Sequence, residues 1–341
     1  MRRLMFCCAA LFAGLVCAAG EGKCTEVADF LKMNQDRKQI TSSGPYDLGV
    51  MLSPYRDGYL WKTPKERTSA IISLGTVPVK SLHRYSLRWE VLQPQFVKMH
   101  IRVAYIDNDG KPMMRYSLGT YENSSAFVKT ERNIFTPPGV KAAQFELVLF
   151  NSKIVETTDR VLGFWKSMKL YDLGPQPRKE ALKDHYGKNL LPFGDFSGFE
   201  VGEKQLSKFR VTPLGPKPYK AEVVERDGKK VLKVNYTPGD FQYIAWDTPK
   251  LPYFGSGAEI RCKIRGKGRV QLMVWYNRPT FATVFHHYGF FELTPEWKEY
   301  RAVFGCDDPL TQKVLFSFAC RDNPAEFEVA ELSLVFPDPA K

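Results

Sequence analysis

Residues 189–200, N-L-L-P-F-G-D-F-S-G-F-E, are the most informative part of this chain for its fold. It follows a polar segment, residues 174–188, in which Pro175 and Pro177 interrupt regular structure. A polar segment of this kind is typical of a boundary between domains. After the stretch, short apolar runs alternate with turns as far as a last strand-like run at residues 327–336. We therefore expect a linker at 174–188 and a second domain at 189–337.

The second half contains further passages that can be compared with a known family. N-L-L stands at residues 189–191, G-D-F at 194–196, and L-T-P-E-W-K-E-Y at 293–300. This order resembles the jelly-roll carbohydrate-binding modules of the galactose-binding-like superfamily. The resemblance covers residues 189–337, and it implies an antiparallel β-sandwich with a carbohydrate as its ligand.

The first half reads as a divergent copy of the second. Apolar and polar residues alternate with a period of two at residues 85–91 and 97–105, which predicts strands with one buried side. Further strands are expected at 127–135, 143–150 and 161–171, and T-P-P-G-V-K-A-A at 136–143 resembles a passage of the same modules. We predict two tandem antiparallel β-sandwich (jelly-roll) domains, the first at 46–173. A short helix at 26–35 is expected within an N-terminal segment, residues 20–45.

The start of the chain predicts export. Arg2 and Arg3 precede an apolar run at residues 4–16, and small residues follow at 18–20. This pattern is typical of a secretory signal peptide, here residues 1–19. The apolar run is too short to span a bilayer comfortably, and no later stretch is apolar enough. We expect a secreted or periplasmic protein without a transmembrane segment.

Composition and charge narrow the partners. The chain has 341 residues, 44% of them hydrophobic and 25% charged, which suits a globular protein of two domains. Its net charge is +12, and loss of Arg2 and Arg3 with the signal peptide leaves +10. A basic surface attracts anionic partners. The lysines and arginines are scattered and do not form one basic stripe, so we expect no nucleic acid as a partner. The expected partner is a polysaccharide or oligosaccharide, and the basic charge leaves open that it is anionic.

Cysteine spacing gives no metal site. Cys24, Cys262, Cys306 and Cys320 remain after the signal peptide, without a C-x-x-C pair. If a disulfide forms, a short loop favours Cys306 with Cys320. The family resemblance raises the question of structural calcium, since such modules usually carry an Asp in the last strand. Lys-Ser at 166–167 and Ala-Glu at 330–331 stand there instead, so calcium is only weakly supported.

The strand at residues 270–277 supplies the candidate binding site. Val270, Leu272, Val274 and Tyr276 form its apolar set, and Trp275 lies on the other side between two amides. An indole face can pack on the apolar face of a sugar ring while amides and imidazoles bind its hydroxyl groups. The alternative is that Trp275 packs against a loop or the other domain. The predicted ligand-binding residues are Trp275, Gln271, Asn277, Trp246, Gln242 and His287.

Catalytic motifs are absent from the sequence, apart from one loose likeness. Glu326, Glu328 and Glu331 resemble the spaced carboxylates of jelly-roll retaining glycosidases, but Glu331 falls on the opposite side of a regular strand unless a bulge intervenes. We therefore favour an exported non-catalytic carbohydrate-binding protein. The alternatives are a glycoside hydrolase or lyase that acts between the two domains, and a structural envelope or protein-interaction protein.

Overall fold

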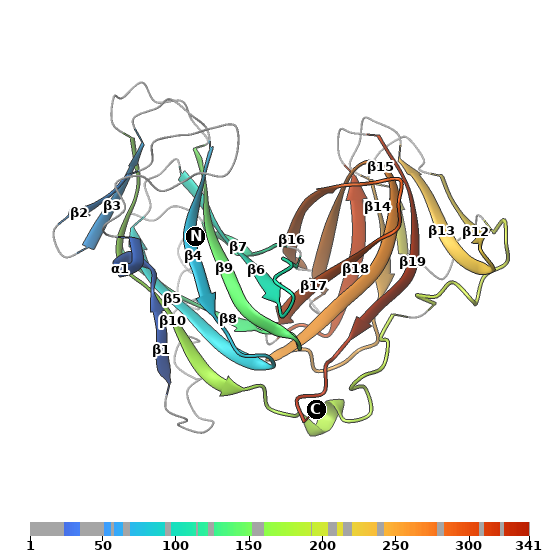
Figure 1. The fold of residues 1–341 in the computed structure, drawn as a ribbon, viewed down its shortest axis with the longest axis horizontal. Helices are drawn as coiled ribbons and strands as arrows, with labels where there is room; N and C mark the ends of the chain where they lie inside the picture. The colour runs from blue at the N-terminus through green and yellow to red at the C-terminus, as the bar shows by residue number, and fades with distance from the viewer. Residues whose placement is uncertain are drawn as a thin grey trace, which may run out of the picture.

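The chain forms two β-sandwiches that lie side by side, as predicted (Figure 1). The computed structural model describes residues 24–34, 51–55, 58–63, 69–92, 97–113, 115–121, 126–151, 160–191, 193–203, 210–213, 220–236, 242–277, 283–306, 310–320 and 324–340. The segment predicted as a signal peptide, residues 1–19, lies outside these ranges. Among the residues within them, no helix has both the length and the apolar character needed to cross a membrane.

The first sandwich has two antiparallel layers that enclose one core. One layer has the order β2 (Met51–Tyr55), β3 (Gly58–Thr63), β10 (Arg160–Pro175), β5 (His83–Leu92) and β8 (Val128–Phe135), with β1 (Thr25–Asp29) also paired to β10. The other has the order β7 (Tyr116–Tyr121), β6 (Val97–Asp107), β9 (Val140–Asn151) and β4 (Ser69–Pro78). Alternation places the apolar side of each strand inward, so Leu87 and Trp89 of β5 face a core shared with Ile101 and Phe145.

Residues 25–34 of the N-terminal segment belong to this sandwich, and the helix predicted at residues 26–35 is mostly wrong. Residues 25–29 form β1, and only Phe30–Asn34 form the helix α1. The chain changes from strand to helix at Asp29, whose carboxylate accepts hydrogen bonds from the backbone N–H groups of Leu31 and Lys32, both at 3.2 Å. Phe30 and Leu31 are buried in the core, which fixes α1 against the sandwich.

The second sandwich also has two layers. We call the first the β19 layer; its order is β12 (Lys220–Arg226), β13 (Lys229–Tyr236), β19 (Ala325–Val335), β15 (Ser256–Asn277) and β17 (Lys298–Cys306). We call the other the β18 layer; its order is β11 (Arg210–Pro213), β14 (Gln242–Asp247), β18 (Lys313–Cys320), β15 and β16 (Thr283–Glu292). Phe318 and Phe327 meet between the layers with ring centroids 5.9 Å apart.

One strand, β15, serves both layers. The strand expected at residues 270–277 is the second half of a single strand, residues 256–277, which pairs with β19 and β17 first, and with β18 and β16 afterwards. Gly266 and Gly268 stand at the crossing, both with positive φ. A Cβ on Gly266 would collide with the backbone of β19, so only glycine allows this close approach.

The segment predicted as a linker is docked on the second sandwich. It contains a single turn of 3₁₀-helix, Glu180–Leu182, and the side chain of Leu182 is fully buried. The backbone N–H of Gly187 donates to the carbonyl of Phe336 at 2.9 Å. The linker therefore contributes to the core instead of standing apart from it. The division into domains at this segment stays a prediction.

The disulfide that the short loop would favour, Cys306 with Cys320, is not formed. None of Cys24, Cys262, Cys306 and Cys320 is in a disulfide. Cys306 ends β17 and Cys320 ends β18, which are strands of opposite layers, and both thiols are buried. They act as small apolar core residues.

A ring of the first sandwich fills a gap in the second. Gly257 of β15 and Gly305 of β17 are direct cross-strand partners, and the buried ring of Phe135, at the end of β8, lies against both. A Cβ on Gly257 would lie 2.6 Å from the Cβ of Phe135, and one on Gly305 would overlap the ring. Tyr105 donates a hydrogen bond to the Phe135 carbonyl, and Tyr276 donates one to the Gly305 carbonyl, both at 2.8 Å. The two sandwiches also meet where β16 pairs with β7.

We expect Gly305→Ala to destabilise the folded protein by about 1–3 kcal/mol, because the added methyl group overpacks the site of the Phe135 ring. Thermal or denaturant unfolding measures the change. In a Phe135→Leu background the same substitution should cost less, since the smaller side chain leaves room. An equal cost in both backgrounds would contradict the contact.

Candidate functional site

The outer face of the β18 layer carries Trp275, as the alternation predicts. Val270, Leu272, Val274 and Tyr276 are each at most 1% exposed in the main core. Trp275 lies on the opposite face of β15 and is partly exposed, and Gln271 is partly exposed on the same face. The predicted assignment of the two faces of this strand is therefore confirmed for the described side chains.

Contacts with neighbouring strands of the β18 layer fix the side chain of Trp275. Its indole Nε1–H donates to the hydroxyl of Ser317 on β18 at 2.9 Å. The ring packs against a small second apolar cluster on this outer face, formed by Ala245, Met273, Leu315 and Ala319. Because the polar edge of the indole is bonded to the sheet, the exposed part of this side chain is a fixed aromatic surface.

Trp246 does not join this surface, which corrects its prediction as a ligand-binding residue. Its side chain is 1% exposed and packs in the main core, with ring centroids 5.9 Å from those of Phe316 and Phe318. The even spacing of Ile244 and Trp246 is the alternation of a core face, and the sequence alone could not distinguish it from a binding face. Only the pairing of β14 with β18 shows which side is covered.

Three other predicted residues are placed by their backbone only. Gln242 pairs with Cys320, Asn277 pairs with Thr283 and Lys313, and His287 pairs with Met273 in the strand register. The side chains of Gln242, Asn277 and His287 lie outside the described residues. The structure thus brings Gln271 and Trp275 onto one face and adds Ser317, which the sequence analysis missed because its role depends on a neighbouring strand.

The outer face of the β19 layer carries the three glutamates, Glu326 and Glu328 by regular alternation and Glu331 because of a bulge. Cys262 of β15 stands opposite two residues, Glu331 and Leu332, where the register with β19 shifts. Glu331 has φ +52°, and Leu332 beyond it is buried. The bulge returns the later residues of β19 to the core and leaves Glu331 exposed, on the same outer face as Glu326 and Glu328.

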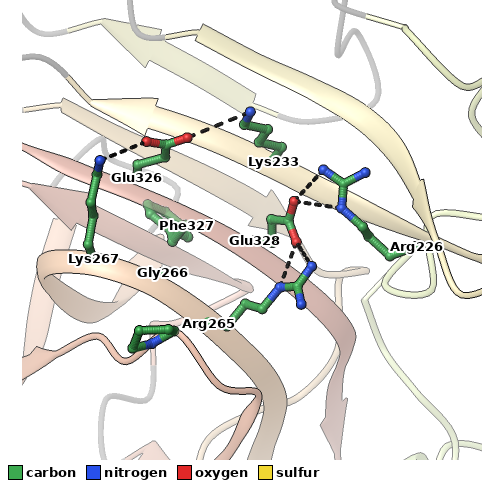
Figure 2. A pocket seen from close by; sticks show the side chains of 9 residues that line it. Arg226, Lys233, Arg265, Gly266, Lys267, Glu326, Phe327 and Glu328 are labelled. Carbon is green, nitrogen blue, oxygen red and sulfur yellow. Dashed lines mark hydrogen bonds and ion pairs between the residues drawn. The ribbon is translucent and has the colours of Figure 1, made fainter.

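Each glutamate of β19 lies between two cations, one from β12 or β13 and one from β15. The three groups are Lys233–Glu326–Lys267, Arg226–Glu328–Arg265 and Lys229–Glu331–Lys263. Figure 2 shows the first two groups side by side. Both arginines bind the carboxylate of Glu328 through Nε and Nη2, at 2.6–2.9 Å. The Nζ atoms of Lys233 and Lys267 stand farther from the carboxylate of Glu326, at 3.6 and 3.5 Å. Sequence spacing could not reveal these groups, because their members come from separate strands.

This arrangement does not suit the glycosidase chemistry that the spacing of the glutamates raised. Burial alone would raise the pKa of Glu328, but the hydrogen bonds from Arg226 and Arg265 outweigh it and hold the pKa below the usual value for Glu. Hydrogen bonds from Lys263 and Lys229 likewise lower the pKa of Glu331. A general acid needs a raised pKa, so neither group is prepared to donate a proton near neutral pH.

The residues at the end of β19 do not fit a calcium ion either. Glu331, which stands near the position of the family's Asp, is bonded to two lysines, at 2.7 and 2.9 Å. Within the described ranges no group of three or more His, Cys, Asp or Glu side chains could hold a metal. Calcium prefers several oxygen ligands, and here the nearest partners of the carboxylate are cations.

Comparisons with known proteins give structural likeness only. No family model matches the chain, and no curated protein matches it. Similar solved structures include the N-terminal CBM22-1–CBM22-2 tandem domain of Xyn10C from Paenibacillus barcinonensis, which is 12% identical in sequence. The match covers 93% of this chain and 99% of that chain, with a TM-score of 0.32.

Single modules and larger proteins are similar to one part of the chain. The family 11 carbohydrate-binding module of Lic26A-Cel5E from Clostridium thermocellum is 14% identical, with 44% of this chain and 94% of that chain covered and a TM-score of 0.33. The enzymatically active domain of tailspike protein 4 of bacteriophage CBA120 is 10% identical, with 43% of this chain and 21% of that chain covered and a TM-score of 0.37. At these scores the assignment as β-sandwiches rests on the strand pairing described above.

The Glu328 cluster should stabilise the protein in a pH-dependent way. Because the folded-state pKa of Glu328 is lowered, its contribution is present above the unfolded pKa of about 4.3 and is lost as the pH falls through the folded value. We expect Glu328→Gln to cost about 1–3 kcal/mol at pH 7, since two charge-assisted pairs are lost. Denaturant unfolding at several pH values should show this difference shrinking below about pH 4.

Glu326→Gln is the matched control on the same strand. Its carboxylate is 39% exposed and its lysines stand farther away, so we expect a loss within about 0–1 kcal/mol. Equal losses for the two substitutions would contradict the special role of the arginine pair.

Proposed function

We propose that this protein is an exported, non-catalytic protein that binds polysaccharide on the outer face of the β18 layer, with Trp275 as the main contact. The observation that carries the proposal is a partly exposed indole, on the side of β15 away from the core, whose Nε1–H is bonded to Ser317. Such a surface offers an apolar plane at fixed orientation, which matches the C–H face of a pyranose ring.

The residues near Trp275 support a sugar ligand. Gln271 lies two alternations away on the same strand face and is partly exposed, so its amide can bind sugar hydroxyl groups. Sheet faces with an aromatic plane and a few amides give the mixed apolar and polar contacts that sugars require. Asn277 and His287 remain part of the proposal, on the basis of their place in the register beside this face.

The sequence supports an exported protein without catalysis. The pattern at residues 1–19 predicts a signal peptide, and polysaccharides are abundant outside the cell membrane. The described carboxylates with the most suggestive spacing are held by cations, with the pKa of Glu328 and of Glu331 lowered. This favours binding over glycoside hydrolysis, because no general acid is prepared among them.

Replacement of Trp275 separates binding from packing. We expect Trp275→Ala to weaken polysaccharide binding by about 1–3 kcal/mol, because alanine cannot replace the aromatic area buried against a sugar. Binding of the purified mature protein to a panel of neutral, uronic-acid and sulfated polysaccharides, followed by titration calorimetry on the best ligand, measures the loss.

Leu272→Ala, next on the strand but in the core, is the control. It should cost about 2–5 kcal/mol of stability and leave the affinity of the folded fraction unchanged. If Trp275→Ala unfolds the protein as readily as Leu272→Ala, or leaves binding intact, the tryptophan is a packing residue and the proposed site is wrong.

A further inference from the structure

A hollow of about 340 Å³ lies on the outer face of the β19 layer, on the opposite side of the second sandwich from Trp275. Four cationic and two anionic side chains line it, together with Gly266, Pro295 and Phe327: Arg226, Lys233, Arg265, Lys267, Glu326 and Glu328. Figure 2 shows the two arginines at one end, with Glu328 between them, and the two lysines at the other, with Glu326 between them. The hollow therefore has a surplus of two positive charges.

The arginine end is rigid. Glu328 binds one guanidinium with each of its two oxygens, and its side chain is only 12% exposed. Trp297 lies under the guanidinium of Arg265, with the carbon Cζ 4.7 Å from the ring centroid. Two guanidinium groups held in this way lose little freedom when they bind an anion. The Nε and Nη2 edge of each faces Glu328, so an oxyanion would be bound by the N–H groups that remain on Nη1 and Nη2. One of these, on Nη1 of Arg226, also donates to the carbonyl of Glu225.

The lysine end holds its charge loosely. Lys233 and Lys267 stand 3.6 and 3.5 Å from Glu326, beyond the usual 2.7–3.2 Å of a hydrogen bond. One carboxylate faces two ammonium groups, so the pair keeps a net positive charge and donor N–H groups for another partner. Lys267 is largely exposed and reaches solvent at the rim of the hollow.

We propose that this hollow is a second binding site, which takes an oxyanion group, a sulfate ester or a carboxylate, carried by a polysaccharide. The surplus of cations and the fixed guanidinium pair, which line one hollow, carry the choice of an anion. The choice of a polysaccharide as its carrier rests on the proposed function. The same chain would then bind a sugar ring at Trp275 and an acidic substituent on the opposite layer.

The test compares two double variants with the same change of charge on the same face. Lys233→Gln with Lys267→Gln removes the two lysines of the hollow. Lys229→Gln with Lys263→Gln removes the pair around Glu331, outside the hollow. Affinities of the full-length mature protein are measured at fixed salt for dextran sulfate, which carries only sulfate, for polygalacturonate, which carries only carboxylate, and for uncharged dextran.

We expect the hollow variant to bind at least one charged polymer about tenfold more weakly than the wild type, because charge-assisted hydrogen bonds are lost. The control variant should change by less than about threefold, since it loses only long-range attraction that salt screens. The polymer that responds identifies sulfate or carboxylate as the group bound.

Three results would overturn the proposal. The first is an equal loss of affinity in the two double variants, which would indicate diffuse attraction. The others are an unchanged affinity in the hollow variant and no binding of either charged polymer. A DNA oligonucleotide that depends on Lys233 and Lys267 as strongly as the polymers do would overturn the choice of a polysaccharide. Trp275→Ala should retain the dependence on these lysines, so a failure at Trp275 can be distinguished from a failure at the hollow.

Discussion

The position of Glu331 on the outer face of the β19 layer depends on a bulge in β19 that Asn189 and Gly194 hold in place. The Asn189 side chain accepts hydrogen bonds from the backbone N–H groups of Leu191 and Leu334 and donates one to the carbonyl of Leu332, each at 3.0 Å. Gly194 lies so close to that carbonyl that any Cβ would overlap it. This explains the N-L-L and G-D-F pattern physically, since both motifs contact the bulge. With the bulge fixed, Glu331 faces outward and β19 can line up its three carboxylates.

Strand β15 connects the two candidate surfaces. Its first half supplies Lys263, Arg265 and Lys267 to the β19 layer, and its second half supplies Gln271 and Trp275 to the β18 layer. The crossing between layers requires backbone contact that only glycine permits. The two surfaces therefore lie on opposite faces of one sandwich, yet a single strand fixes their relative position. A long polymer would have to pass around the sandwich to touch both, so two separate chains or two short segments are the simpler ligands.

The contact between the two sandwiches depends on a large side chain that packs against two glycines. Two cross-strand glycines leave a gap, and Phe135 enters it from the first sandwich. Together with the docked linker, this contact favours a fixed arrangement over two modules on a flexible tether. The described side chains that carry the candidate sites belong to the second sandwich.

The strands, and the inward side of most of them, could be predicted from the sequence, because alternation with a period of two follows from backbone geometry wherever one face is buried. It correctly put Trp275 opposite Leu272, and it predicted that only a bulge could bring Glu331 to the side of Glu328. It could not separate Trp246 from Trp275, since alternation defines two faces without saying which one is covered. Nor could it gather Arg226 and Arg265 around Glu328, or place Phe135 in its glycine gap. These contacts join strands that are distant in the sequence, and only the tertiary pairing of those strands decides them.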